Sequence, residues 1–417
     1  MIPESAPSTT HENPAIIVGL DSSQGLQTAR ILAGYHIPVI GISRSENHFC
    51  NSTNVCERIL IANTKTEALI DLLTEIGPSF SRKPVLYPCT DISVLLISRH
   101  RQILNPYFHI VLPDPELVEL LLDKPNFYSF AEQNGFPIPR TFILKNREDA
   151  LAAAQNLNFP AILKPAKKTQ TWEQHVKVKV DKVFSKAEFI EKYDQYVQWS
   201  EIMIGQESIE GKETNLYACN VYYSKSHERL GAVVSRKLRQ FPLETGNGCL
   251  REEVQNRTVL EETTRLFDHV RYAGLGYLEF KKDDQTGEFF IIEPNIGRPT
   301  GGSAIAEGCG IELLYAMYCD ATEIPMRANL KQTRFGTKWL YILEDIQSAF
   351  KCWRSGNLSL FEWLTSWRGF KIYAIFSWKD PAPFLMQFQD LKKKWKSGIA
   401  RSSIEQQTVR LERDQFS

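Results

Sequence analysis

Short apolar runs alternate with helix-like stretches over the first quarter of the chain. The apolar runs cover 15–19, 38–42, 59–62 and 85–87, and the helical stretches cover 26–33, 66–76 and 92–104. Strands that alternate with helices favour a parallel, doubly wound sheet. We therefore predict an α/β domain over residues 14–112, which follows a polar, frayed tail over residues 1–13.

Two glycines in this domain, Gly19 and Gly25, invite comparison with dinucleotide-binding folds. Their Gly-x5-Gly spacing differs from Gly-x-Gly-x-x-Gly, and Ser43-Arg44-Ser45 stands after the second strand, where an acidic residue would hold a ribose. A nicotinamide cofactor is therefore disfavoured. A tight turn between strand and helix explains the glycines better.

The pattern changes to mixed helices and strands from Pro113 onward. The expected helices cover 115–122, 126–134, 148–157 and 258–270, and the expected strands cover 141–144, 160–165, 197–204, 217–223 and 230–236. The stretch 167–175 is polar and irregular, which is typical of a loop.

The region from about residue 331 onward is rich in helical patterns and in tryptophan. It holds six of the eight tryptophans: Trp339, Trp353, Trp363, Trp367, Trp378 and Trp395. These rings are not interleaved with a basic groove pattern, as stacking on nucleic-acid bases would require. We expect them to pack a helical appendage.

A β-hairpin is predicted near residue 285. Apolar runs over 277–281 and 288–293 flank a short turn, in which Gly287 stands at the left-handed position. The simplest register closes the loop with Asp284 and Glu288. A bulge would shift this register by one residue.

The simplest register places Glu279 opposite Glu293. Two facing carboxylates repel, and Glu293 would share its face with Phe289 and Ile291. A cation between them would stabilise the pair, and Mg²⁺ suits it because Asn295 adds a further oxygen ligand. The alternative is an exposed strand glutamate beside a turn.

Two lysines complement this pair. Lys164 lies between Leu163 and Pro165 on an apolar run, and lysines are seldom buried without a partner. Lys124 follows Asp123 at a helix junction. Each lysine alone is better explained as structural or solvated, but together with the carboxylates they indicate a magnesium–nucleotide site. The chain contains no Gly-x-x-x-x-Gly-Lys-[Ser/Thr], so it is not a P-loop enzyme.

Composition narrows the class of protein further. The 417 residues include 49 Lys or Arg and 49 Asp or Glu, so the net charge is zero and a nucleic-acid partner is disfavoured. No apolar run is long enough to span a membrane, and residues 1–13 lack the apolar core of a secretory signal. Eight scattered cysteines without a Cys-x-x-Cys pair fit a reducing cytosol, so we expect a cytoplasmic protein.

Taken in order, these segments resemble an ATP-grasp enzyme over nearly the whole chain. AIIVGLDSSQGLQTARIL resembles the domain before the nucleotide site, and Asp123-Lys124 with AEQNGFPIPRTF resembles the opening of the nucleotide domain. PAILKPA resembles the second lysine strand, SEIMIGQE the adenine hinge, and GYLEF with IIEPNIGR the two metal strands. GAVVSRKLRQFPLETGNG and the Trp-rich end resemble a subgroup of predicted carboxylate–amine ligases, some of them similar to D-aspartate ligase.

The resemblance implies an ATP-grasp fold of the α/β (α+β) class. It divides the chain into a Rossmann-like pre-ATP-grasp domain, a small ATP-grasp subdomain, a large subdomain with the metal site and a helical Trp-rich region, at 14–112, 113–199, 200–330 and 331–417. The implied reaction joins a small-molecule carboxylate to an amine through an acyl phosphate, with ATP and Mg²⁺, or Mn²⁺ in its place. An amino acid or a cell-surface or peptide carboxylate is the expected substrate.

The resemblance also gives a role to each matching residue. The nucleotide-binding positions are Lys124 and Lys164 for the phosphates, Glu201, Ile202, Met203 and Ile204 for adenine, and Glu207 for the ribose. The metal ligands are Glu279, Glu293 and Asn295, and the catalytic residue that neutralises the phosphoryl oxygens is Arg298. Lys237 and Arg239 are candidates for contacts with a substrate carboxylate or phosphate, although solvated strand-end cations are favoured.

Two features depart from the family pattern. Arg298 follows Asn295 by three positions, whereas Glu-x-Asn-x-Arg is frequent in the family. The loop after Lys164 contains no glycine to close over phosphate. Lys167 and Lys168 would supply positive charge there instead, although a solvated loop is favoured.

Other functions and partners stay open. An ATP-grasp kinase would use the same site to phosphorylate a hydroxyl group. A non-catalytic nucleotide-binding scaffold would not need these lysines and carboxylates, so their presence argues against it. A homodimer is also open. The basic run at 392–396 could touch an anionic membrane surface, but a solvated helix end explains it better.

Overall fold

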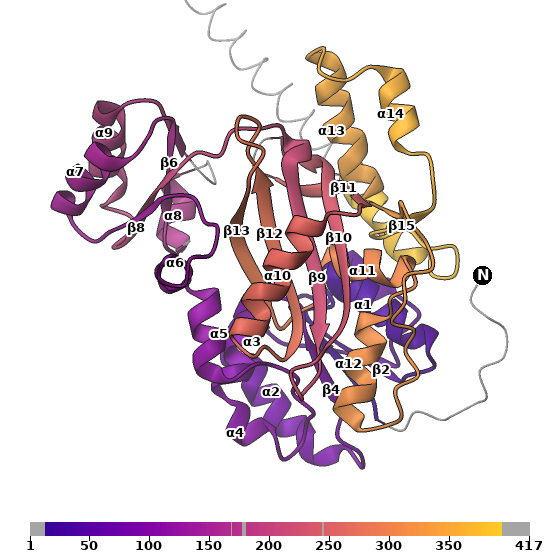
Figure 1. Cartoon of the computed structure of the whole chain (residues 1–417). Helices are drawn as coiled ribbons and strands as arrows, with labels where there is room; N and C mark the ends of the chain where they lie inside the picture. Colours follow the sequence, from indigo (N-terminus) through magenta and orange to yellow (C-terminus); the bar gives the residue numbers. More distant parts are fainter. Residues whose placement is uncertain (1–12, 168, 177–180, 244–245, 394–417) are drawn as a thin grey trace, which may run out of the picture.

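The computed structural model describes residues 13–167, 169–176, 181–243 and 246–393. Three β-sheets flanked by helices make up this part of the chain (Figure 1). Residues 1–12, for which the sequence predicts a frayed tail, Lys168, and positions 394–396 of the basic run lie outside the described residues. Within those ranges, no helix is long and apolar enough to cross a membrane.

The first sheet is parallel and has the strand order β3-β2-β1-β4. Its strands are β1 (Ala15–Val18), β2 (Val39–Ser43), β3 (Arg58–Ile61) and β4 (Val85–Pro88). The helices of this part are α1 (Ser23–Gly34), α2 (Ala68–Ile76), α3 (Asp91–Arg99) and α4 (Arg101–Leu104). The predicted parallel α/β arrangement is confirmed.

The turn between β1 and α1 explains both glycines. Gly19 has a φ of 100°, a conformation that side chains with a Cβ rarely adopt. A Cβ on Gly25 would lie 2.2 Å from the Gly19 carbonyl oxygen. Helix α1 begins before the predicted start at 26, because the Ser22 side chain caps it by accepting a hydrogen bond from Gly25 N.

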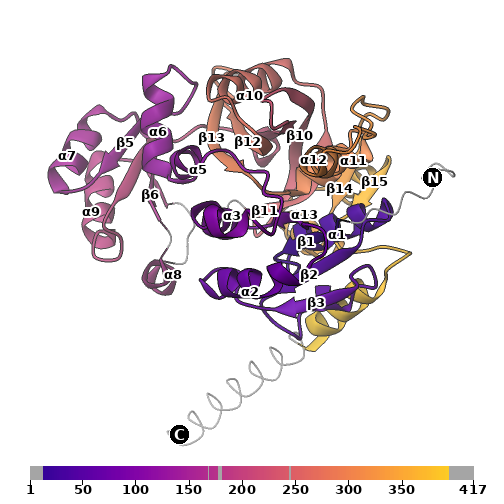
Figure 2. The same ribbon diagram turned by 90° about the horizontal axis from the view of Figure 1, so that it is seen from below.

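The second sheet is antiparallel and has the order β5-β8-β6-β7. Its strands are β5 (Thr141–Leu144), β6 (Ala161–Pro165), β7 (Asp181–Val183) and β8 (Met203–Glu207). Helices α7 (Arg147–Asn156) and α9 (Lys186–Tyr196) cover one face, where Leu163 and Met203 pack in one cluster with Phe189. Helices α5 (Pro115–Leu122) and α6 (Lys124–Gln133) precede this sheet, and α5 lies beside α3 (Figure 2).

Two local predictions in this part are wrong. The strand expected over 197–204 begins only at Met203, because α9 continues to Tyr196 and residues 197–202 form the connection. The loop expected over 167–175 contains a short helix, α8 (Gln170–His175), which the Thr169 side chain caps by accepting from Trp172 N.

The third sheet has seven strands in the order β13-β12-β9-β10-β11-β14-β15. They are β9 (Leu216–Tyr223), β10 (Arg229–Phe241), β11 (Asn247–Glu253), β12 (Gly274–Lys282), β13 (Phe289–Ile296), β14 (Lys338–Leu340) and β15 (Lys371–Tyr373). Helix α10 (Arg257–His269) covers one face (Figure 1). Helices α11 (Gly301–Gly308) and α12 (Leu313–Thr322) pack on the other face together with the first sheet.

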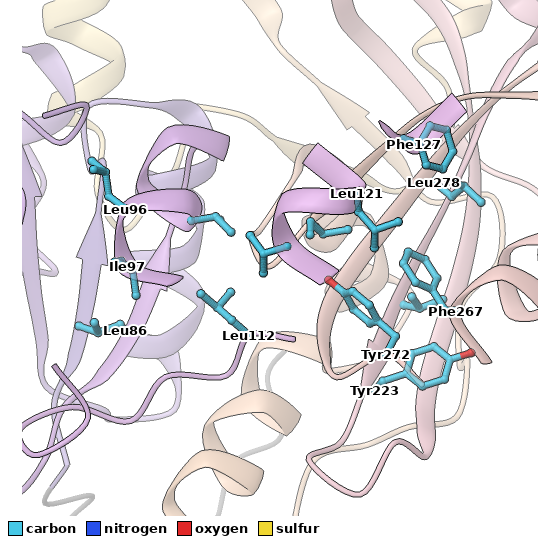
Figure 3. Packing of buried hydrophobic residues seen from close by; sticks show 14 of the residues in the cluster. Leu86, Leu96, Ile97, Leu112, Leu121, Phe127, Tyr223, Phe267, Tyr272 and Leu278 are labelled. Atoms are coloured by element: carbon cyan, nitrogen blue, oxygen red, sulfur yellow. The ribbon is translucent and has the colours of Figure 1, made fainter. Parts of the chain in front are cut away.

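One hydrophobic cluster runs from the first sheet into the third (Figure 3). Leu86 and Ile97 belong to it in the N-terminal part, Leu121 in α5, and Phe267 and Leu278 on the α10 face of the large sheet. These side chains are almost completely buried. The N-terminal sheet and the large sheet are therefore fixed to each other by shared packing.

The C-terminal region is helical, as expected, but it also extends the large sheet. Helix α13 (Ile342–Arg354) lies beside β10 and β11, helix α14 (Leu360–Ser366) follows it on the outer side, and β14 and β15 add two short strands to the sheet edge (Figure 1). Residues 382–393 form a further helix. Trp339 is buried and Trp363 and Trp367 are half-buried, in agreement with a packing role for these three rings.

A buried ion pair holds α13 to the sheet. The guanidinium of Arg239 donates to Asp345 through Nε at 2.7 Å and through Nη2 at 3.0 Å, and the Asp345 side chain is 0% exposed. The indole N–H groups of Trp363 and Trp367 donate to the same carboxylate at 3.2 and 2.7 Å. Asp345 therefore fixes the whole helical hairpin through four hydrogen bonds.

We expect Asp345→Ala to lower the free energy of unfolding by about 3–5 kcal/mol, because it leaves the Arg239 charge buried without its partner. Urea unfolding followed by tryptophan fluorescence measures this. Asp194→Ala is the matched control: its pair with Arg147 has side chains that are 44% and 58% exposed, so about 0–1 kcal/mol is expected. Equal effects of the two substitutions would contradict a structural role for the Asp345 pair.

Candidate functional site

The predicted carboxylate pair lies on one face of the large sheet. Glu279 of β12 and Glu293 of β13 are direct partners across an antiparallel ladder, which confirms the predicted pairing. Tyr277 and Asn295, two positions along, are the next partners on the same face. The two carboxylates and the amide are thereby brought together by the ladder itself.

The loop of this hairpin differs from the simplest register. Asp283, and not Asp284, closes it: Asp283 N donates to Glu288 O at 2.8 Å. Gly287 has a φ of 75°, as predicted for its left-handed position. One extra residue in β13, Ile292, then shifts the register and restores the pairing of the two glutamates.

The bulge also decides which side chains are buried. Ile291 pairs with Phe280, and both are fully buried on the α10 face. Because Ile292 is an extra residue, Glu293 points to the opposite face. The prediction that Glu293 shares a face with Phe289 and Ile291 is therefore wrong, since strict alternation does not hold across a bulge.

Each carboxylate has a lysine partner. Lys237 Nζ lies 2.6 Å from Glu279 Oε1, and these side chains are only 11% and 12% exposed. Lys124, the first residue of α6, places Nζ 3.9 Å from Glu293 Oε2. The two cations offset the repulsion between the glutamates. Lys237 is thus not the solvated strand-end cation that the sequence allowed.

Arg298 links the metal strand to the N-terminal domain. Its Nε donates to Asp91 Oδ1 at 2.5 Å and its Nη2 donates to Asp91 Oδ2 at 3.2 Å. The Nη2 atom also donates to Asn295 Oδ1. Burial disfavours the charged guanidinium, but Asp91 and Glu293 outweigh burial and raise the pKa of Arg298 further, so it stays charged.

Lys164 is buried, as its apolar surroundings predict, and it has polar partners. Its Nζ donates to Tyr128 OH at 2.9 Å and to Gln206 Oε1 at 3.0 Å. The Tyr128 hydroxyl in turn donates to the carbonyl oxygen of Ile292 at 2.6 Å. A chain of hydrogen bonds therefore joins the small sheet, α6 and the bulge beside the carboxylate pair.

A cavity of about 820 Å³ lies between the start of α6 and the connection before β8. Glu201 and Ile202 line it, together with Lys167, which pairs with Asp123 at 3.7 Å. Met203 and Ile204 are fully buried in the sheet, and they are not among the residues that line the cavity. Any contact they make with a ligand there would use the backbone.

Two of the predicted site residues, Glu207 and Arg239, bind other groups of the protein. Glu207 accepts hydrogen bonds from Asn158 N and Nδ2 at 3.0 and 2.9 Å, and β8 alternation puts it on the opposite face from Gln206, which binds Lys164. This position does not favour a ribose contact. Arg239 is 6% exposed and bound to Asp345, so its proposed contact with substrate is corrected to a structural ion pair.

The structure adds residues that the sequence interpretation missed. Tyr128 is four positions after Lys124, and this spacing places both on one face of α6. Asp91 follows β4 at the carboxyl end of a parallel strand, where α/β sheets bind ligands. The spacing of Tyr128 from Lys124 and the position of Asp91 after a strand can both be recognised in the sequence. The pairing of Asp91 with Arg298 depends on distant packing and had no local signal.

The donors of this site fit a magnesium ion. In the described part of the chain no group of three His, Cys, Asp or Glu side chains could hold a metal, so any third protein ligand would be a donor of another kind, such as the Asn295 amide. Its oxygen has two lone pairs, which allows it to accept from Arg298 and bind a cation as well. Two carboxylates and one amide are all hard oxygen donors.

The chain resembles known ligases in sequence, although no family model matches it. It is 27% identical over 241 residues to the D-aspartate ligase of Enterococcus faecium (strain Aus0004), which covers 55% of this chain and 57% of that protein. It is 22% identical over 189 residues to the D-alanine–D-alanine ligase of Pseudomonas entomophila (strain L48), which covers 42% and 54%. The chain thus spans about half the length of these curated relatives.

Two solved structures share its fold. One is the biotin carboxylase domain of the Hydrogenobacter thermophilus 2-oxoglutarate carboxylase in complex with MgADP, with a TM-score of 0.61, 13% identity and coverage of 79% of this chain and 74% of that chain. The other is the N5-carboxyaminoimidazole synthetase of Staphylococcus aureus complexed with ADP, with a TM-score of 0.60, 13% identity and coverage of 78% and 81%. The fold is therefore the ATP-grasp fold. The curated relatives that the chain resembles are ligases.

We expect Tyr128→Phe to lower the free energy of unfolding by about 1–3 kcal/mol, because it removes a buried link between Lys164 and the Ile292 carbonyl. Tyr193→Phe is the control, since the buried Tyr193 hydroxyl has no hydrogen-bond partner among the described residues and its loss should be neutral or stabilising. Urea unfolding compares the two. If both changes are neutral, the hydrogen-bond chain through Tyr128 does not contribute to stability.

Proposed function

We propose that this protein is an ATP-dependent carboxylate–amine ligase, which forms an amide through an acyl phosphate and uses ATP and Mg²⁺. The observation that carries the proposal is the opposed pair Glu279 and Glu293 with a lysine beside each carboxylate. The similarity to the D-aspartate ligase and the nucleotides in the two solved structures support it.

In the proposed reaction, an oxygen of the substrate carboxylate attacks the γ-phosphorus of ATP, and the bond from this phosphorus to ADP breaks. The amine nitrogen then attacks the acyl carbon, the bond to phosphate breaks, and the nitrogen loses a proton. Neither step needs covalent chemistry from the protein, so catalysis rests on positioning and on charge.

The candidate residues divide this work among them. Lys124 and Lys164 would contact the phosphates, and Arg298, which Asp91 holds in place, would lie against the oxygens of the transferred phosphoryl group. Glu279, Glu293 and Asn295 would hold Mg²⁺, which offsets phosphate charge when bound. The cavity lined by Glu201 and Ile202 would take the adenine.

Lys237 would change its role when the site is loaded. Its partner in this structure is Glu279, at 2.6 Å. If Glu279 held a metal ion, the Lys237 ammonium group would be available for an anionic oxygen of the substrate or of the phosphate. The same residue would thus stabilise the carboxylate pair in one state and the reacting anion in the other.

Separate observations support a proposal for the substrate class and one for the compartment. The relative's name and the predicted subgroup favour an amino acid as one substrate, with a peptide or cell-surface carboxylate as the acid. All eight cysteines are free, which fits a reducing cytoplasm where ATP is supplied.

ADP release should occur with one acid–amine pair when the protein is screened against amino acids, singly and in pairs, with Mg²⁺ and ATP. In the presence of hydroxylamine and the acid alone, we expect a hydroxamate, because only an activated carboxyl reacts in this way. A colorimetric iron assay measures it. ADP release without hydroxamate from any carboxylate would favour a kinase and contradict the ligase proposal.

Glu293→Gln should reduce ADP release at least about 100-fold, since a carboxylate ligand of the metal contributes several kcal/mol to charge stabilisation. Glu288→Gln, on the exposed loop of the same hairpin, is the matched control and should keep full activity. Circular dichroism checks that both variants fold. Turnover retained by Glu293→Gln would rule out its assignment as a metal ligand.

A further inference from the structure

The helical hairpin of α13 and α14 buries polar side chains and exposes apolar ones. The side chains that α13 buries are polar or small: Asp345, Ser348 and Ala349. A second face of this helix is apolar, and its residues follow each other at spacings of four and three positions. They are Ile346, Phe350 and Trp353, which are 40%, 50% and 45% exposed. The usual distribution of an amphipathic helix is therefore reversed in α13.

Helix α14 has the same character. None of its residues is completely buried, and its exposed apolar side chains are Leu360, Phe361 and Leu364, at 52%, 71% and 69%. No apolar side chain of residues 342–370, all of which lie in the described ranges, belongs to the three hydrophobic clusters of the molecule. The hairpin is held instead by the hydrogen bonds to Asp345 and by the one that Ser348 donates to the Gln240 carbonyl oxygen at 2.8 Å.

The exposed apolar side chains of these two helices form what we call the hairpin patch: Ile346, Phe350, Trp353, Leu360, Phe361 and Leu364. The hairpin projects from the rest of the molecule, with the connection at 355–359 at its tip (Figure 1). Several large apolar side chains on one projecting element are unfavourable in water and mark a surface of interaction. A projecting surface fits a partner that deforms around it better than one that must offer a matching groove.

The charges of the hairpin indicate the kind of partner. Residues 346–370 contain three cations, Lys351, Arg354 and Arg368, and one acid, Glu362. All three cations are exposed. Glu362 accepts a hydrogen bond from Ser359 N at 2.8 Å, which lowers the pKa of the carboxyl and keeps its charge at the start of α14. The hairpin therefore presents a net positive charge together with its apolar side chains.

We propose that the hairpin patch docks this protein on an anionic lipid surface. The leucine, phenylalanine and tryptophan side chains enter the boundary between headgroups and acyl chains, and the lysine and arginine side chains reach the lipid phosphates. A second copy of this chain is a poorer partner, because a two-fold interface between two such hairpins brings like charges together. The docking is separate from the ligase site and does not depend on the proposed reaction.

Co-sedimentation of the full chain with lipid vesicles measures the docking. One set of vesicles contains phosphatidylglycerol mixed with phosphatidylcholine, and the other contains phosphatidylcholine alone. We expect the wild-type protein to bind the anionic vesicles about 10- to 100-fold more tightly than the neutral ones, because each exposed cation near the surface adds to the attraction. Higher salt should weaken this binding, since it screens the charges.

Phe361→Gln combined with Leu364→Gln should weaken binding to the anionic vesicles at least about 10-fold, because two apolar side chains no longer leave water. Both positions are exposed, and thermal unfolding checks that the fold is kept. Phe184→Gln combined with Leu151→Gln is the matched control: these side chains, next to β7 and in α7 at the small sheet, are 66% and 41% exposed. The control should bind like the wild type, whereas Arg354→Gln should weaken binding about fivefold.

The proposal is overturned if the wild-type protein binds neither kind of vesicle or binds both equally tightly. It is also overturned if the variant of Phe361 and Leu364 binds as tightly as the wild type, which would make the basic run at 392–396 the lipid contact. Light scattering of the wild type and of this variant detects self-association. A dimer that the variant abolishes would overturn the proposal too, since a second copy of this chain would then cover the patch.

Discussion

The carboxylates of Glu279 and Glu293 face each other across β12 and β13. Much of the surrounding structure compensates for the repulsion between them. A like-charge pair on a sheet face is costly without positive charge nearby. The countercharges are Lys237 from β10 and Lys124 from α6, which come from elements far apart in the sequence. The position of α6 itself is fixed by packing, since Phe127 and Tyr128 belong to the hydrophobic cluster that also contains Leu278.

The β-bulge at Ile292 is the local feature that makes this possible. It turns Glu293 toward the site while Ile291 stays in the core beneath α10. Its carbonyl oxygen accepts a hydrogen bond from Tyr128, which receives one from Lys164. A single extra residue thus aligns the second glutamate and anchors the small sheet to the large one.

How far the sequence predicts this site depends on how local each determinant is. The burial of Lys164 follows from strand pattern alone and is observed. The predicted pairing of Glu279 with Glu293 is also observed, but only because the bulge at Ile292 compensates for a loop that closes one residue earlier than predicted. Lys237 and Arg239 are two positions apart on β10, so strict alternation would place both side chains on one face of the sheet. The register shifts between Lys237 and Gln240 break that alternation, and Arg239 turns to Asp345.

Other differences between prediction and structure also arise where the determinant is not local in the sequence. The start of β8 at Met203 and the helix α8 depend on capping and on where α9 ends, which short apolar patterns do not specify. The partnership of Arg298 with Asp91 joins positions 207 residues apart and follows from docking of the N-terminal domain. The hydrophobic cluster shared by the first and third sheets fixes that docking, and it is recognisable only in three dimensions.

The internal partners of the site residues suggest how it can be both stable and reactive. Glu279 has Lys237, Glu293 has Lys124, Asn295 has Arg298, and Lys164 has Tyr128 and Gln206. Each group that would meet a cation or a phosphate therefore has a protein partner of suitable charge or polarity. Ligand binding then exchanges one set of partners for another and leaves few charges uncompensated, so it avoids most of the cost of exposing an unpaired buried charge.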